Sequence, residues 1–302
     1  MHVFRALLLA LITPLTLGGV AQSAPTETSY RAEIEAWRAQ RVARLTSETG
    51  WLTLVGLYWF KPGGNTFGRA RDNALVLDHA ALAPRAGTFL LEGRTVRFTA
   101  SADAGITSSG QAVASTDMAP DTSGNPTVLA SGSLRFFVIE RAGRLGLRVR
   151  DSASSMRTQF QGLDYFPIDE TWAVHARFHP YQPAKQISIV NILGMVEHMT
   201  APGYLTFTRS GQEWRLDAVL EEPDASELFL MFADATTGRE TYGAGRFLYV
   251  PLPQAGEVSL DFNKAYNPPC AFNEFATCPL PPRQNRLSLR VEAGERAYRG
   301  SH

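Results

Sequence analysis

The chain has little cysteine and little lysine, and it lacks several short motifs of common enzymes. Its 302 residues contain two cysteines and three lysines. There is no Gly-x-Ser-x-Gly elbow, no P-loop and no Gly-x-Gly-x-x-Gly fingerprint. These absences argue against an α/β-hydrolase, a P-loop NTPase and a dinucleotide-binding enzyme. The formal net charge is +0, so charge does not favour a nucleic acid or an anionic membrane as a partner.

Long apolar runs are also missing, apart from one short run at the N-terminus. Arg5 precedes the apolar stretch 6–17, and the small residues Gly18, Gly19 and Ala21 follow it. This order is typical of a secretory signal peptide, and the run is shorter than the roughly 20 residues that span a bilayer. We therefore expect a signal peptide at 1–21, with cleavage after Ser23 fitting nearly as well. The mature protein would be exported, periplasmic or extracellular, without stable membrane insertion.

Both cysteines lie in a proline-rich segment, residues 266–285, which we call the proline loop. It holds five of the eighteen prolines, and proline at this density favours a rigid, irregular loop. Cys270 and Cys278 have seven residues between them. In an exported chain this pair favours one disulfide over a metal pair, because a zinc site usually needs four ligands. A free nucleophilic Cys270 is less favoured still, and no metal or cofactor is predicted.

Hydrophobic periodicity predicts a mostly β protein with one helix near its start. The spacing of apolar residues predicts a helix over 28–49. Short strands separated by turn residues then predict a β-sandwich over 50–150. Further strands, among them 172–178 and 187–193, predict a second β unit over 151–302 that carries the proline loop. We expect the two sandwich-like or barrel-like units to pack against each other.

Three segments carry a resemblance to a known family. Residues 50–59 (GWLTLVGLYW), 240–248 (ETYGAGRFL) and 261–270 (DFNKAYNPPC) resemble DUF1684, a bacterial domain of unknown function. The resemblance extends over nearly the whole mature chain. It supports the domain organisation and implies no activity.

A second resemblance concerns residues 60–150. Gly68-Arg69, the segment 73–77 and the segment 87–89 resemble the opening of a forkhead-associated β-sandwich, a family that reads phosphothreonine with an Arg, a Ser and an Asn. Arg69 matches the Arg, but residues 83–86 (APRA) stand where the Ser-x-x-His signature belongs. The resemblance therefore implies the sandwich fold and gives no support for phosphopeptide binding.

The strongest cluster of polar residues lies between positions 234 and 267 and admits two interpretations. In the first it forms a ligand pocket, in which an arginine clamps an anion, tyrosines form walls and Asp and Asn orient a polar ligand. In the second it is a buried network of ion pairs and hydrogen bonds that braces the proline loop, since buried charges are normally paired. The predicted ligand-binding residues are Tyr242, Arg246, Asp261, Asn263, Tyr266 and Asn267.

These observations favour a non-catalytic binding or structural-interaction protein of the cell envelope. Its ligand would be small and either polar or anionic. The alternative is a hydrolase acting on an envelope glycan or ester at the same pocket. In that case Glu240 or Asp261 would serve as acid or base, since carboxylates carry out glycoside hydrolysis.

Overall fold

The structure, a computed structural model, describes residues 27–300, so the predicted signal peptide lies outside the described residues. It begins with helix α1, Glu27–Thr46, close to the predicted helix. The chain turns sharply at Gly50, where a Cβ would lie 2.2 Å from the carbonyl oxygen of Leu45. Only glycine allows this approach, which keeps the chain leaving α1 against the last turn of the helix. None of the described helices is long and apolar enough to cross a membrane.

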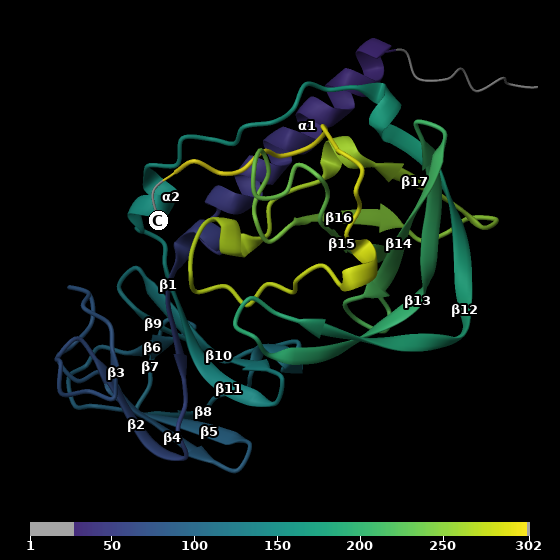
Figure 1. Cartoon of the computed structure of the whole chain (residues 1–302). Coiled ribbons are helices and arrows are strands. Elements are labelled where there is room, and N and C mark those ends of the chain that lie inside the picture. The colour runs from purple at the N-terminus through teal and green to yellow at the C-terminus, as the bar shows by residue number, and fades with distance from the viewer. Residues whose placement is uncertain (1–26, 301–302) are drawn as a thin grey trace, which may run out of the picture.

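The next eleven strands form a sandwich of two sheets (Figure 1). One sheet has the strand order β1-β11-β10-β9-β6-β7, and the other has the order β3-β2-β4-β5-β8. Buried phenylalanines from both sheets meet between them, with Phe67 and Phe136 ring centroids 5.4 Å apart. The strands are β1 Leu54–Trp59, β2 Gly63–Gly68, β3 Leu75–Val76, β4 Gly87–Glu92, β5 Thr95–Ala100, β6 Thr107–Ser108, β7 Gln111–Ala112, β8 Ser115–Asp117, β9 Val128–Ser131, β10 Leu134–Arg141 and β11 Arg144–Asp151.

The remaining strands form one curled six-stranded sheet, the barrel unit. Its strand order is β16-β15-β14-β13-β12-β17, and the edge strands β16 and β17 come into contact. Alternate residues fill its interior, including Leu248 and Val250 of β16, while Phe247 and Tyr249 point to the outer face. The strands are β12 Ala173–Val190, β13 Val196–Arg209, β14 Gln212–Leu220, β15 Glu227–Phe232, β16 Arg246–Pro251 and β17 Glu257–Asp261. The mostly β fold with two β units and an N-terminal helix is confirmed.

Short helical turns join these elements. The four-residue helix α2, Ser155–Thr158, lies between the two β units. Its first turn is capped by Ser154, whose hydroxyl accepts a hydrogen bond from the Arg157 amide and donates to the Leu52 carbonyl at 2.6 Å. The 3-10 turns are η1 Trp51–Thr53, η2 Asp121–Ser123, η3 Glu170–Trp172, η4 Phe262–Lys264, η5 Pro269–Ala271 and η6 Arg283–Asn285.

Helix α1 packs on the barrel unit, although the sandwich follows it in the sequence (Figure 1). Arg41 Nε lies 2.9 Å from Glu295 Oε1, and Arg41 Nη2 donates to the Asn267 carbonyl at 2.8 Å. Leu45 is fully buried in a cluster with Phe272 of the proline loop. The chain therefore enters on the barrel unit, builds the sandwich and returns, which creates a cleft where helix, sandwich and barrel unit meet.

Candidate functional site

A cleft of about 1930 Å³ lies between α1, the tip of the β10–β11 hairpin and the outer face of the barrel unit. The proline loop closes one side of it through Thr277 and Cys278. Two contacts hold the sandwich against this side. The Ala142 amide donates to Glu197 Oε1 at 2.9 Å, and Arg148 Nη2 donates to Thr277 Oγ1 at 3.2 Å.

One side of the cleft is an aromatic wall made of Trp37, Tyr266 and Tyr249. The rings of Tyr249 and Tyr266 are stacked, with centroids 6.2 Å apart, and Trp37 lies 6.5 Å from Tyr266. Two reciprocal backbone hydrogen bonds of 2.9 Å with Phe247 fix Tyr266 beside β16. Tyr249 retains 37% of its surface exposed. Its ring therefore offers a rigid apolar surface to a ligand.

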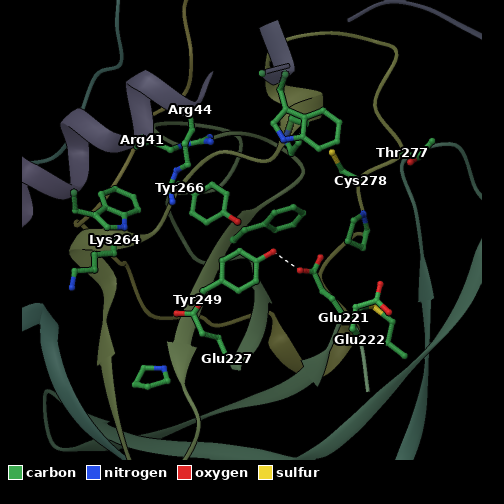
Figure 2. Close-up of a pocket in the computed structure, with 18 of the residues that line it drawn as sticks. Arg41, Arg44, Glu221, Glu222, Glu227, Tyr249, Lys264, Tyr266, Thr277 and Cys278 are labelled. Atoms are coloured by element: carbon green, nitrogen blue, oxygen red, sulfur yellow. Dashed lines mark hydrogen bonds between the residues drawn. The ribbon is translucent and has the colours of Figure 1, made fainter. Parts of the chain in front are cut away.

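Carboxylates stand beside the aromatic wall. Glu221 and Glu222 follow β14, Glu227 opens β15, and we call these three residues the acidic group (Figure 2). The Tyr249 hydroxyl donates to Glu221 Oε2 at 2.5 Å. Burial, together with the neighbouring Tyr266 and Glu221, raises the pKa of Tyr249. Its phenol therefore stays protonated and serves as a hydrogen-bond donor.

Two of the six predicted ligand residues, Asp261 and Tyr266, line this cleft. Asp261 Oδ1 accepts hydrogen bonds from the Tyr30 hydroxyl at 3.0 Å and from the backbone N–H of Asn263 at 2.9 Å. Asn263 is fully buried, and its Nδ2 donates to the Asp169 carbonyl at 2.9 Å. Asp261 and Asn263 thus share one network, which also anchors the start of α1.

Arg246 lies outside the cleft, in a buried network of an ion pair and hydrogen bonds in which its partners lie outside the proline loop. It is 1% exposed, and Nη2 lies 2.7 Å from Asp234 Oδ2. The same nitrogen donates to the Val291 carbonyl at 2.9 Å, and Nη1 donates to the Ala293 carbonyl. Burial lowers the pKa of Arg246, and the Asp234 carboxylate opposes this effect. These bonds tie the C-terminal segment to β16.

The other predicted residues also hold internal positions. Asn267 is fully buried, and its Nδ2 donates to the Arg296 carbonyl at 2.7 Å. The Tyr242 hydroxyl donates to the Cys270 carbonyl at 2.8 Å. Glu240 accepts two hydrogen bonds from Arg290 Nη2, at 3.0 and 2.8 Å, and does not line the cleft. The structure therefore does not bring Glu240 and Asp261 into one cavity.

Comparison with known proteins identifies the family to which the cleft-bearing part of the chain is similar. Residues 158–296 match the family model described as "Protein of unknown function (DUF1684)". The chain belongs to this family. It is also similar to the solution NMR structure of an uncharacterized protein of Haloarcula marismortui, with 33% identity over 47% of this chain and 80% of that one and a TM-score of 0.40. No curated protein matches.

The DUF1684 region supplies only part of the cleft. Tyr249, Tyr266 and the acidic group lie inside residues 158–296, whereas Trp37 and Trp51 come from the segment before the sandwich. Residues 60–150 lie in a sandwich, as the forkhead-associated resemblance implies, but the resemblance itself stays a prediction. The cleft is thus shared between the DUF1684 region and the N-terminal part of the chain.

The predicted disulfide of the DUF1684 region is wrong. Cys270 and Cys278 are free thiols, and the Cys270 amide donates to Cys278 Sγ at 3.1 Å. Cys278 is 4% exposed, and burial together with Cys270 raises the pKa of its thiol, which stays protonated and unreactive. Within residues 27–300, no group of three or more His, Cys, Asp or Glu side chains is arranged to hold a metal ion.

Sequence reasoning missed most of the residues that line the cleft. Trp37 is one of the apolar residues whose spacing predicts the helix over 28–49, and Tyr249 sits inside an apolar strand, FLYV. Glu221 and Glu222 lie in the turn between β14 and β15, and Glu227 is the first residue of β15. The one available signal was the strand alternation at Tyr249, which places its ring opposite the buried Leu248 and Val250.

Proposed function

We propose that this protein is an exported, non-catalytic binding protein and that the cleft holds a small polyhydroxylated ligand. The observation that carries the proposal is the partly exposed aromatic wall beside unpaired carboxylates. Neither Glu222 nor Glu227 has an ion-pair partner among the residues described. Export rests on the N-terminal sequence, with its Arg5 and the apolar stretch 6–17.

The chemistry of the cleft suits such a ligand. Ligand sites combine apolar and aromatic surface with a few polar groups that fix orientation. The face of Tyr249 would cover the C–H face of a sugar ring, and the carboxylates of Glu222 and Glu227 would accept hydrogen bonds from hydroxyl groups. Hydrogen bonds to a charged acceptor are about twice as strong as those between neutral groups.

The alternative, hydrolysis of a glycan or ester, has less support from the geometry. A tyrosine with a raised pKa is a poor nucleophile, so the Tyr249–Glu221 pair does not provide an activated group. Glu240 is engaged by Arg290 outside the cleft, and Oδ1 of Asp261 accepts internal hydrogen bonds. These contacts favour binding over turnover.

The test starts with native mass spectrometry of protein expressed with its full N-terminus and recovered from the periplasm. We expect a mass consistent with loss of residues 1–21 and a ligand that is lost on denaturation. A panel of cellotriose, maltotriose and chitotriose is then titrated into the protein by calorimetry. We expect one of them to bind and none to be cleaved.

Substitution of Tyr249 connects that binding to the cleft. Tyr249→Ala should weaken the affinity about tenfold or more, because it removes the stacking surface. Tyr249→Phe should retain most of the affinity, since the ring remains. Tyr204→Ala, on the barrel unit but outside the cleft, is the matched control. Equal binding by Tyr249→Ala and wild type contradicts the proposal, and cleaved sugar in the titration cell supports the hydrolase.

A further inference from the structure

Arg148 is a buried positive charge without a carboxylate partner. It lies on β11 and is 2% exposed. Its Nε is buried and has no hydrogen-bond partner, and within residues 27–300 no carboxylate lies within 4 Å of its guanidinium. Its shortest hydrogen bond, at 3.2 Å, goes to the neutral hydroxyl of Thr277. A buried ion without a counter-charge costs several kcal/mol, so this arrangement needs an explanation.

Arg148 stands directly behind one end of the cleft. Its two side-chain neighbours there, Trp51 and Thr277, both line the cleft. Thr277 Oγ1 accepts from Arg148, so its own hydroxyl hydrogen remains available to a ligand. Arg44 lines the same cleft, is exposed, and has no ion pair among the described residues. In Figure 2 Arg44 and Thr277 lie in the upper part of the view, on opposite sides of it, whereas Glu227 lies in the lower part.

Two acidic residues of the cleft lining beside the β10–β11 hairpin, Asp121 and Glu140, already have partners. Asp121 Oδ2 lies 2.7 Å from Arg141, and Glu140 is paired with Arg94. Arg150, the next basic residue along β11, adds a second buried Nε without a hydrogen-bond partner. Burial and the neighbouring Arg141 lower the pKa of Arg148 to about 10, so it remains charged at neutral pH.

We propose that the Trp51–Thr277 end of the cleft is a binding subsite for an oxyanion, a carboxylate or a phosphate group. The anion accepts a hydrogen bond from the Thr277 hydroxyl, and Arg44 pairs with the anion from the exposed side. Arg148 supplies positive charge from the buried side of Thr277. Arg148 is thus a positioning residue that holds and polarises Thr277. The inference rests on the proposed ligand-binding function, because the anion is one end of the ligand that the aromatic wall holds.

A purely structural role explains Arg148 less well. A connection between β11 and the proline loop needs only a neutral donor, and methionine of similar length would fill the space without a charge. Replacing a buried, uncompensated ion by an apolar residue is often neutral or stabilising. The presence of a cation at this position therefore points to an anion that balances its charge.

The test measures thermal unfolding of the full mature protein in inorganic phosphate, with sodium chloride added to keep the ionic strength constant. Phosphate at ten times its dissociation constant should raise the Tm of the wild type by roughly 2–4 °C. Thr277→Val and Arg148→Met should abolish the shift, and Arg44→Ala should reduce it. Thr208→Val and Arg144→Met, exposed positions outside the cleft, should keep it. Acetate in place of phosphate then shows which anion the subsite prefers.

Each result decides the proposal. A Tm that follows ionic strength alone, or a phosphate shift that persists in Thr277→Val, overturns it and leaves Arg148 as a structural connection. Should Arg148→Met fail to fold, Thr277→Val still decides the question. Because the probe is a free anion, the readout is independent of saccharide binding. If phosphate does not raise the Tm but a saccharide binds in a Tyr249-dependent way, only the subsite is refuted. If phosphate raises the Tm but no saccharide binds, only the saccharide proposal is refuted.

Discussion

At the scale of single residues, Arg246 and Asp234 form a buried ion pair within the polar cluster. Both side chains are at most 1% exposed. Removing one partner leaves an uncompensated buried charge, so we expect Arg246→Ala to lower the free energy of unfolding by about 3–5 kcal/mol. Urea denaturation followed by circular dichroism measures this change.

The exposed pair of Arg85 and Asp72 provides the control for that experiment. These side chains are 49% and 73% exposed, and their N···O distance is 3.1 Å. Arg85→Ala should cost no more than about 1 kcal/mol, because water screens the pair. An Arg246→Ala protein as stable as the wild type but unable to bind ligand would support the anion clamp instead.

The residue types of the polar cluster are evident from the sequence, but the sequence does not show which of them enter an internal network and which line the cleft. Arg246 and Tyr249 lie three residues apart on one strand, yet one closes an internal network and the other faces the cleft. Burial depends on segments far away in sequence, here the C-terminal carbonyls of Val291 and Ala293. The cysteine pair shows the same limit of sequence-based prediction. Neither the spacing of two cysteines nor the cellular compartment determines whether their sulfur atoms form a disulfide.

At the scale of elements, Arg41 supplies the buried ion pair between α1 and the C-terminal part of the chain. Arg41 pairs with Glu295, which is fully buried, and covers the Tyr266 ring at 4.6 Å. We expect Arg41→Ala to lower the free energy of unfolding by about 3 kcal/mol or more, because Glu295 loses its only ion-pair partner among residues 27–300. Hydrogen exchange of the α1 amides should accelerate in this variant.

Arg44 on the same helix is the matched control. It is exposed and unpaired, so Arg44→Ala should change the stability by no more than about 0.5 kcal/mol in the absence of ligand. Unchanged α1 protection in Arg41→Ala would mean that apolar contacts such as that of Leu45 hold the helix by themselves.

The strands of the barrel unit show which features could be predicted from the sequence and which could not. Residues 172–178 and 187–193 carry strand patterns and were predicted as separate strands. In the structure β12 runs through both, with an irregularity in its pairing to β13 between Pro180 and Lys185. The polar, proline-containing segment between them hid this continuity, because proline removes a ladder hydrogen bond. The mostly β class was predictable, since it needs only local periodicity.

At the scale of the whole molecule, sequence order and spatial order differ. The sandwich has its own core of phenylalanines and aliphatic residues. The barrel unit has an apolar core too, but α1, which lies more than 100 residues before it in the sequence, adds a buried cluster with the proline loop. Local patterns predicted that both units exist and left open which unit the helix joins. That choice is made by long-range contacts such as Arg41 with Glu295.

This arrangement predicts that the DUF1684 region alone is not an autonomous folding unit. A fragment of residues 158–300 would bury Glu295 without Arg41 and expose the surface of Phe272 that Leu45 covers. We expect it to bind a hydrophobic dye and to lack a sharp thermal transition. A second protein that keeps 27–49 and joins it to 152–300 through a flexible linker, without the sandwich, should recover cooperative unfolding. If residues 158–300 alone unfold as sharply as this second protein, α1 adds only a wall of the cleft and not a part of the barrel unit's core.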